Sequence, residues 1–333
     1  MNELTLTAKD FKSDQEVRWC PGCGDYAILN AVQSFMPELG LQREKIVFVS
    51  GIGCAARFPY YMETYGMHSI HGRAPAIATG LSVSRPDLSV WVVTGDGDSL
   101  SIGGNHLIHA LRRNVNLKIL MFNNRIYGLT KGQYSPTSEL GKVTKSTPMG
   151  SLDAPFNPLS LAIGAEATFV ARAIDTDKKE LTEVLRAAAR HKGSAFVEIY
   201  QNCNIYNDGA FDFVREQKEN RLYLRHGEPI VWGDPATGQR GVRLRPDGSA
   251  EVVAATEPGL LVHDAHALEP AHAFALSRLT QTSIGATPFG VFRSVERPVY
   301  DELMADQIET AKTTRGEGDL AALLGSGDMW SIA

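Results

Sequence analysis

Short apolar runs alternate between residues 26 and 200 with longer segments whose apolar residues recur at helical spacing. The runs are rich in Val, Ile, Leu and Phe, so they predict buried strands at 45–50, 88–94, 117–122, 169–173 and 195–200. The longer segments predict helices at 26–35, 74–83, 103–113 and 178–191. Strands that alternate with helices predict an α/β fold, with a mostly parallel sheet and helices on both faces.

The rest of the chain follows this pattern less closely. Residues 1–16 are polar and predict an N-terminal arm, residues 17–210 form the α/β domain, and residues 211–333 form an irregular C-terminal extension packed on the core or on a partner. Within the extension, 227–248 predicts hairpins or loops, and 269–280 and 299–313 predict helices. The stretch 125–158 predicts a loop that is long enough to be functional or ordered by a partner.

The central strand–helix–strand unit carries the first candidate chemistry. Gly95, Asp96 and Gly97 follow one buried strand, and Asn123-Asn124 ends the next. Glycines allow a tight turn and a close approach by a ligand, and a turn that opens a helix attracts phosphate. The Asp96 carboxylate and the Asn124 amide oxygen suit Mg²⁺, together with a backbone carbonyl and phosphate oxygens.

Four cysteines are the second candidate. Cys20 and Cys23 form a CPGC loop, while Cys54 and Cys203 each follow a predicted strand. Ligands gather at the carboxyl ends of strands in parallel sheets, so Cys54, Asp96, Asn124 and Cys203 are expected at one edge. Four thiolates suit a [4Fe–4S] cluster or Zn²⁺, and the spacing also leaves open a redox pair or cysteines without a ligand.

The glycine–aspartate–glycine turn, the 25 residues after it and the asparagine pair resemble the diphosphate-binding signature of thiamine diphosphate enzymes. The wider set WCPGCG, GIGC, HGRA, GDGD, NN and a late NC resembles the β subunit of 2-oxoacid:ferredoxin oxidoreductases, most closely the 2-oxoglutarate type. The resemblance covers about residues 15–210, with the motifs in the family's order. It implies the thiamine diphosphate-binding fold for the α/β domain.

The resemblance also implies a role for individual residues. One [4Fe–4S] cluster would be held by the thiolates of Cys20, Cys23, Cys54 and Cys203, and Mg²⁺ by the side chains of Asp96 and Asn124 and the carbonyl of Ile126. Thiamine diphosphate would meet Ile52, Gly53, Cys54, Ala55, His71, Gly72, Gly95, Asp96, Gly97, Asp98, Asn124, Gly128 and Leu129. Lys131 is a candidate for the substrate carboxylate, and His71 and Lys131 are the candidate catalytic residues.

The function implied is oxidative decarboxylation of a 2-oxo acid to acyl-coenzyme A and CO₂, with ferredoxin as electron acceptor and with carboxylation as the reverse reaction. Thiamine enzymes need a glutamate against the aminopyrimidine ring, and no motif here marks one. The resemblance therefore implies an obligate α subunit in an αβ or (αβ)₂ assembly. Pyruvate or a branched-chain 2-oxo acid could replace 2-oxoglutarate. A non-oxidative thiamine decarboxylase or synthase with a structural zinc is a second reading, and an electron-transfer subunit with a vestigial turn is a third.

Composition narrows the setting. The net charge is −5 and the pI is about 6.0, which favours neither nucleic acid nor an anionic membrane as partner. No apolar run approaches the roughly 18 residues that a membrane span needs, and the first residues lack the apolar core of a signal peptide. We therefore expect a cytoplasmic enzyme whose cysteines do not form disulfides.

Overall fold

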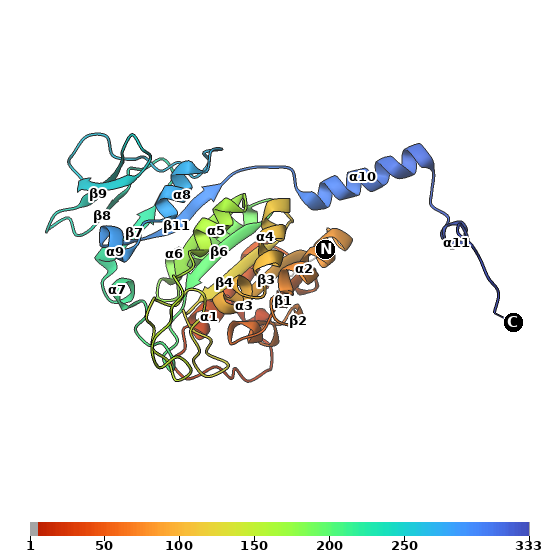
Figure 1. Ribbon diagram of the computed structural model, residues 1–333, viewed down its shortest axis with the longest axis horizontal. Helices are drawn as coiled ribbons and strands as arrows, with labels where there is room; N and C mark the ends of the chain where they lie inside the picture. The colour runs from red at the N-terminus through yellow and green to blue at the C-terminus, as the bar shows by residue number, and fades with distance from the viewer. Residues whose placement is uncertain (1–5, 333) are drawn as a thin grey trace.

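The computed structural model describes residues 6–332, which form one large mixed sheet with helices on both faces and a smaller antiparallel sheet (Figure 1). The large sheet has the strand order β2-β1-β3-β4-β6-β5-β11-β7. The first six strands are parallel, β11 is antiparallel to β5, and β7 is parallel to β11. The predicted α/β fold with a mostly parallel sheet is therefore confirmed.

The strands are β1 (Ile46–Ser50), β2 (Tyr65–His68), β3 (Ser89–Gly95), β4 (Lys118–Asn123), β5 (Phe169–Ile174), β6 (Ala195–Tyr200), β7 (Arg221–Leu224), β8 (Val231–Trp232), β9 (Arg240–Leu244), β10 (Ala250–Ala254) and β11 (Thr287–Ser294). The α-helices are α1 (Asp25–Phe35), α2 (Ala74–Ser84), α3 (Asp96–Leu100), α4 (Gly104–Arg113), α5 (Pro158–Gly164), α6 (Lys178–Arg190), α7 (Asp212–Arg215), α8 (Ala271–Ser277), α9 (Gln281–Ile284), α10 (Tyr300–Arg315) and α11 (Leu320–Leu324). Short 3₁₀ helices are η1 (Ala8–Phe11), η2 (Met36–Leu39), η3 (Arg43–Lys45), η4 (Ala55–Tyr61) and η5 (Lys218–Asn220).

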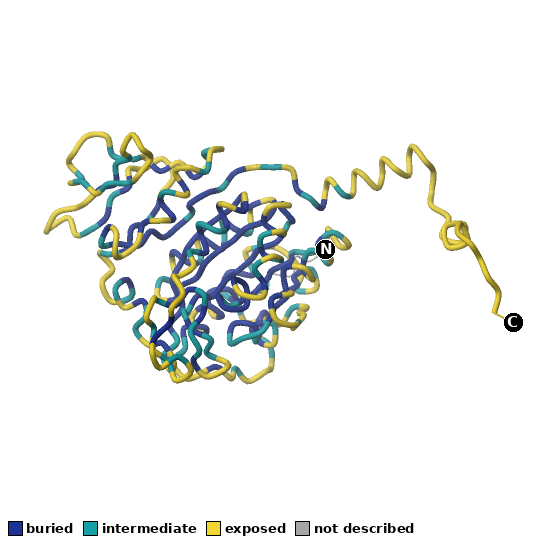
Figure 2. The backbone as a smooth tube through the Cα atoms, viewed as in Figure 1, coloured by how far each residue is buried: buried dark blue, intermediate teal, exposed yellow. Residues whose placement is uncertain are grey.

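Alternate residues of the strands enter two apolar clusters, one on each face of the sheet. In β1, Val47 and Val49 join the cluster covered by α2, α4, α5 and α8, whereas Ile46 and Phe48 join the cluster covered by α1 and α6. This is the period-two pattern of a strand, and both of its faces are apolar because both faces are covered. The strands of the large sheet and the inner faces of the helices are accordingly buried (Figure 2).

Every strand and helix predicted between residues 26 and 200 is present, with ends shifted by no more than a few residues. The helices expected at 269–280 and 299–313 correspond to α8 and α10, and the stretch expected to form hairpins or loops contributes β8 and β9. The edge strand β2 and the strands β7, β10 and β11 were not predicted. Beyond Asn124, the described chain runs to α5 without a helix or an extended strand, as expected for the long loop.

The C-terminal extension supplies β7 and β11 to the large sheet and carries the small sheet β10-β9-β8. Its last part leaves the body: Asp301, at the start of α10, accepts hydrogen bonds from Ser82 and Asn116, and the rest of α10 and α11 projects outward (Figure 1). This projecting arm, residues 303–332, is exposed except at the half-buried Met304 (Figure 2). Its exposed apolar residues include Leu320, Leu324 and Trp330.

At the other end, residues 1–5 of the expected N-terminal arm lie outside the described residues. Phe11, in η1, is fully buried and belongs to the same apolar cluster as α1. Within residues 6–332, no helix combines the length and the apolar character needed to cross a membrane.

Candidate functional site

The parallel strands β1, β3, β4 and β6 lie side by side, so the segments that follow them meet at one edge of the sheet. A cavity opens at this edge. It is lined by the last residues of β3 and β4, by the segments after β1, β3 and β4, and by one residue after β2. These residues are Ile52, Gly53, Cys54, Ala55, His71, Gly95, Asp96, Gly97, Asp98, Ser101, Ile102, Phe122, Asn124, Ile126, Tyr127, Gly128, Leu129 and Thr130. Almost all of the residues expected to meet a cofactor therefore share one cavity.

Asp98 ties three of these segments together. Its Oδ1 accepts hydrogen bonds from the backbone N–H of Gly72 at 2.8 Å and of Ile52 at 3.3 Å, and its Oδ2 accepts one from the Thr94 hydroxyl at 2.9 Å. Burial raises the pKa of this carboxyl, and the bonds from Gly72, Thr94 and Ile52 oppose that rise. Asp98 therefore fixes the wall of the cavity, and Gly72 contributes through this bond from outside the lining.

Gly97 brings the glycine turn close to the segment after β4. A Cβ built at residue 97 would stand 2.2 Å from Cε1 of Tyr127, whose hydroxyl donates to the Gly97 carbonyl at 3.2 Å. Gly72 is equally constrained, because its Cβ would stand 2.5 Å from the Gly103 backbone, and its φ is +69°. Only glycine fits at these two positions without a shift in the neighbours.

The three groups expected to bind Mg²⁺ all line the cavity. The Asp96 carboxylate is 2 % exposed, and burial raises its pKa, while hydrogen bonds from Ser135 and Thr137 lower it. The Asn124 side-chain oxygen accepts a hydrogen bond from the backbone N–H of Ile126 at 3.1 Å, which orients the amide. A buried carboxylate, an amide oxygen and a carbonyl form an all-oxygen donor set of the kind that hard cations prefer.

The cysteines gather beside this cavity. A Cβ at Gly128 would lie 3.4 Å from Sγ of Cys54 and 3.7 Å from Sγ of Cys203. Both thiols therefore lie next to Gly128. Cys54 also lines the cavity itself. Gln201 donates from Nε2 to Sγ of Cys23 at 3.2 Å, and Trp19 donates to the Cys54 carbonyl at 2.7 Å. The expected cofactor cavity and the cysteine group therefore share a wall.

The surroundings of Cys23 and Cys54 disfavour the deprotonated, negatively charged thiolate unless a cation is bound nearby. Burial raises the pKa of Cys54 to about 12, and the charge of Asp25 adds to the rise. The pKa of Cys23 is raised by the same two causes. Asp25 is 1 % exposed, its two carboxylate oxygens have no hydrogen-bond partner among the described residues, and burial raises its pKa to about 7. All three groups would gain from a positively charged centre among them.

As the side chains stand in residues 6–332, no three His, Cys, Asp or Glu groups are arranged so that they could hold a single metal ion. Mutual effects on pKa link Cys23 and Cys54 to Cys203, and Cys54 to Cys20, so the four thiols are neighbours without meeting at one point. Four thiolates are a donor set that either a [4Fe–4S] cluster or Zn²⁺ accepts.

The two expected catalytic residues lie near the rim. The His71 side chain lines the cavity, is 64 % exposed, and holds Nδ1 3.8 Å from Oδ1 of Asp98. Lys131 is exposed and follows the lining residue Thr130, with φ at 76°, a left-handed conformation that is uncommon for lysine. His71 therefore stands beside the buried Asp98 carboxylate, and Lys131 stands next to the cavity lining in an exposed turn.

Sequence reasoning missed several residues of the site. Tyr127 packs on the glycine turn, and Ser135 and Thr137 reach Asp96 from the long loop. Ser135 and Thr137, on either side of Pro136, belong to no helical or strand periodicity and to no motif with the spacing of metal ligands. The only sequence feature that indicates a function for this segment is the length of the loop.

The surroundings of the cavity are apolar and exposed. Ile102 and Leu129 line the cavity and are 61 % and 48 % exposed, and the long loop displays Leu140, Met149 and Leu152. Exposed apolar areas of this kind occur at protein–protein interfaces and at ligand-binding grooves. The lining, which lies wholly within the described residues, contains no glutamate.

Known proteins with similar sequences include thiamine diphosphate enzymes. Residues 51–199 match the family described as thiamine pyrophosphate enzyme, C-terminal TPP binding domain. The chain is 62 % identical over 331 residues to the 2-oxoglutarate oxidoreductase subunit KorB of Mycobacterium tuberculosis, an alignment that covers 97 % of this chain and 88 % of that one.

Two further relatives extend the comparison. The 2-oxoacid:ferredoxin oxidoreductase subunit beta of Saccharolobus solfataricus is 45 % identical over 213 residues, or 63 % of this chain and 69 % of that one. The solved structure of 2-oxoglutarate:ferredoxin oxidoreductase from Magnetococcus marinus, with 2-oxoglutarate, coenzyme A and succinyl-CoA bound, superposes with a TM-score of 0.78 at 34 % identity. That superposition covers 98 % of both chains.

Proposed function

The chain belongs to the family of 2-oxoacid:ferredoxin oxidoreductase β subunits, and from this we propose that it is the β subunit of a 2-oxoglutarate:ferredoxin oxidoreductase that contains thiamine diphosphate, Mg²⁺ and one [4Fe–4S] cluster. The enzyme converts 2-oxoglutarate and coenzyme A to an acyl-coenzyme A and CO₂ and passes electrons to ferredoxin. The same reaction run backward fixes CO₂.

One observation carries the proposal: Cys54 lines the cavity that carries Asp96 and Asn124 and also lies beside Cys203. Thiamine diphosphate supplies an electron sink for decarboxylation of a 2-oxo acid. An acceptor for the released electrons must lie close to it. A non-oxidative thiamine enzyme has no need of a metal cluster on the wall of its cofactor cavity, so this arrangement favours the oxidoreductase.

The residues of the chain divide the work of binding. Asp96, Asn124 and the carbonyl of Ile126 hold Mg²⁺, and the turn at Gly97 and Gly128 lets the backbone approach a diphosphate. Asp98 keeps this wall in place through Gly72 and Ile52. The remaining expected contacts, from Gly53 to Ala55 and at Leu129, surround the ring end of the cofactor.

Cys20, Cys23, Cys54 and Cys203 hold the cluster. The four thiols are neighbours, and a cationic centre would relieve the raised pKa values of Cys23 and Cys54. Gln201 donates to the sulfur of Cys23 at 3.2 Å, and hydrogen bonds to ligating sulfurs raise the reduction potential of such a centre. Cys20 is exposed, which makes this loop the exit for electrons toward ferredoxin.

Lys131 and His71 face the substrate side. We assign Lys131 to a carboxylate of the 2-oxo acid, because it is a cation held at the rim of the cavity by a strained turn. His71 is a donor or acceptor beside the reacting carbons. Its distance of 3.8 Å from Asp98 lets the buried carboxylate orient the ring.

The β chain does not act alone. The lining of its cavity contains no glutamate for the aminopyrimidine ring, and Ile102, Leu129 and the long loop expose apolar side chains around the opening. An α subunit that supplies the glutamate and covers this surface completes the site. The exposed leucines of the projecting arm are also what a subunit of a larger assembly displays.

The proposal is tested by comparing the activity of the enzyme with three different 2-oxo acids. The chain is purified anaerobically with its co-expressed α subunit, and coenzyme A-dependent reduction of a viologen dye is followed with 2-oxoglutarate, pyruvate and 2-oxoisovalerate in turn. Reduction with 2-oxoglutarate at the highest kcat/KM supports the proposal. Preference for another acid corrects the substrate but keeps the class, and decarboxylation without dye reduction overturns the oxidoreductase.

A further inference from the structure

The carboxylate expected to bind Mg²⁺ is held by the long loop that begins after β4. We propose that Ser135 and Thr137 are positioning residues for Asp96, and that through them the binding of Mg²⁺ and thiamine diphosphate is coupled to the docking of loop 125–158. This inference rests on the proposed function, since it assumes that Asp96 is a cation ligand.

Two hydroxyls meet one oxygen of the carboxylate. Ser135 and Thr137 each donate to Oδ2 of Asp96, in both cases at 2.5 Å. All three side chains are buried, with exposed fractions of 2 %, 4 % and 2 % for Ser135, Thr137 and Asp96. Since Oδ2 is taken by both hydroxyls, Oδ1 is the oxygen that can be offered to a cation.

The two hydroxyls come from one tight turn that is itself anchored. Ser138 accepts a hydrogen bond from the backbone N–H of Ser135 at 2.8 Å and donates to the carbonyl of Arg125 at 2.6 Å. Arg125 stands between Asn124 and Ile126, the other two expected ligands. The turn at 135–138 therefore touches the segment that carries every expected Mg²⁺ ligand after β4.

Residues of the large sheet also contact the turn at 135–138. The Thr137 hydroxyl lies 2.9 Å from Oδ1 of Asn123, whose amide donates to Glu198 at 2.7 Å. Glu198 is paired with Arg172 at 2.7 Å, and both are almost fully buried. The hydroxyl has one proton and two neighbouring acceptors, and the shorter contact is the one to Asp96.

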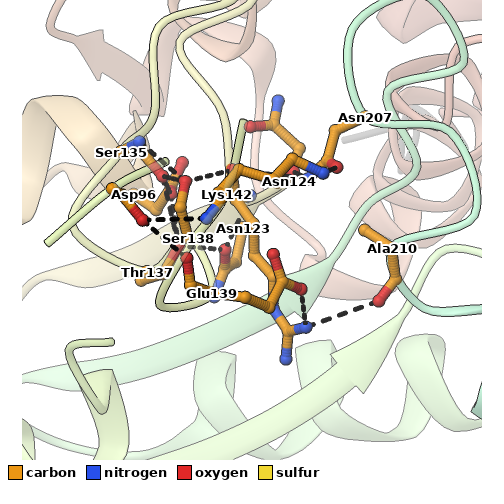
Figure 3. A network of polar contacts seen from close by, with 12 residues as sticks. Asp96, Asn123, Asn124, Ser135, Thr137, Ser138, Glu139, Lys142, Asn207 and Ala210 are labelled. Carbon is orange, nitrogen blue, oxygen red and sulfur yellow. Dashed lines mark hydrogen bonds and ion pairs between the residues drawn. The ribbon is translucent and has the colours of Figure 1, made fainter. Parts of the chain in front are cut away.

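Asn207, in the segment after Cys203, adds further hydrogen bonds to the residues around Asn124. Asn207 donates from its amide to the carbonyls of Asn124 at 3.0 Å and Arg125 at 3.3 Å, and it accepts a hydrogen bond from Lys142 of the loop. Figure 3 shows these side chains converging on Asp96 and Asn124 from the loop and from the segment after β6. The loop is thus attached on both sides of the expected ligands.

The physical consequence is a coupling between the loop and the cation. A buried carboxylate whose hydrogen bonds are removed is strongly destabilised, so the loop cannot leave while Asp96 stays in place unless water or another group replaces both hydroxyls. A carboxylate fixed by two bonds to one oxygen is also preorganised for a ligand at the other. Because binding couplings are reciprocal, a cation that favours this carboxylate position favours the docked loop by the same factor.

Mutations at three positions test the coupling in the complete αβ complex. Thr137→Val and Ser135→Ala remove one hydroxyl each, Thr137→Ser keeps the hydroxyl, and Ser146→Ala removes an exposed hydroxyl of the same loop. The probe is MgCl₂, titrated at fixed thiamine diphosphate with calorimetry as the readout. Loss of a group that orients a metal ligand typically weakens metal binding by about 10- to 100-fold.

We expect Thr137→Val and Ser135→Ala to raise the half-saturating Mg²⁺ concentration by at least about tenfold, with Thr137→Ser much closer to wild type and Ser146→Ala unchanged. Hydrogen exchange gives a second readout that needs no turnover. Adding Mg²⁺ and thiamine diphosphate should protect residues 125–158 in wild type, and this gain should shrink in Thr137→Val and Ser135→Ala.

The failures of the two proposals differ. A wild-type complex that binds no Mg²⁺ with thiamine diphosphate overturns both. A wild-type complex that binds them, with Thr137→Val binding equally well, overturns only the positioning role. Equal losses in Thr137→Val and Thr137→Ser also contradict it, because the hydroxyl would then not be what matters. Hydrogen exchange that is unchanged in the loop on cation binding contradicts the coupling.

Discussion

The ring of Tyr127 lies directly against the α-carbon of Gly97, so that a Cβ at residue 97 would stand 2.2 Å from Cε1 and 2.6 Å from Cζ. This contact closes the glycine turn onto the segment that follows β4. Replacement of Gly97 by alanine should therefore displace the ring, and overpacking of this kind costs about 1–3 kcal/mol. We expect weaker binding of thiamine diphosphate by roughly tenfold or more, measured by calorimetry on the αβ complex.

The contact also predicts a rescue. Once Tyr127 is shortened to alanine, the added methyl at residue 97 has room, so the double variant should bind no worse than Tyr127→Ala alone. Gly104→Ala serves as the matched control, because a Cβ at that position meets nothing within 4 Å. Equal losses in Gly97→Ala and Gly104→Ala would count against a specific role for the contact.

We expect Asp98 to stabilise the fold mainly because its carboxylate oxygens accept hydrogen bonds, and less because of its negative charge. Replacement by alanine removes the partner of the Gly72 and Ile52 amides, and an unpaired buried group costs about 1–3 kcal/mol. Replacement by asparagine keeps Oδ1 as acceptor and can donate to the Thr94 hydroxyl. We expect a clear drop in the thermal midpoint for Asp98→Ala and a smaller one for Asp98→Asn. A drop of the same size in both would mean that the charge is what the site needs.

His191 gives the fold a defined response to acid. Burial lowers its pKa to about 4, and the charge of Lys118 acts in the same direction. In the unfolded chain the pKa is about 6.5, so between these values only the unfolded state binds the proton. The free energy of unfolding should therefore fall as pH drops from about 6.5 to about 4, by roughly 1.4 kcal/mol per pH unit, and no further below that range.

A comparison of variants isolates this contribution. His191→Gln has no group to titrate, so the difference in thermal midpoint between wild type and His191→Gln should shift in favour of the variant as pH falls below about 6.5. His109→Gln, at an exposed position, should follow wild type. A wild-type minus His191→Gln difference that does not change between pH 7 and pH 5 would show that His191 is not kept neutral by the fold.

The motifs after β1, β3, β4 and β6 could be placed from the sequence because each follows a buried apolar run of strand length. Parallel strands bring such ends together whatever the connections contain, so the sequence alone predicts that Cys54, Asp96 and Asn124 lie at one edge. The helices followed from spacing in the same way, as with Leu181, Val184, Leu185 and Ala188 of α6.

Elements whose stability comes from distant contacts were not predictable. β11 contains Pro288 and Gly290, which weaken a strand signal, and it forms only because it pairs between β5 and β7. β2 is exposed along its length and gives no apolar run. Ser135 and Thr137 belong to a segment without periodicity, and only the fold brings their hydroxyls to Asp96, about forty positions earlier in the chain.

The decisive measurement for the proposed oxidoreductase is whether electrons from the substrate reach the cysteine group. The anaerobic αβ complex is mixed with 2-oxoglutarate, with coenzyme A and without ferredoxin, and electron paramagnetic resonance is recorded alongside iron and sulfide content. If the proposed function is correct, we expect about four iron atoms per β chain and a paramagnetic reduced cluster that forms only when 2-oxoglutarate is added. Zinc in place of iron, or an iron cluster that stays oxidised while 2-oxoglutarate is decarboxylated, would contradict it.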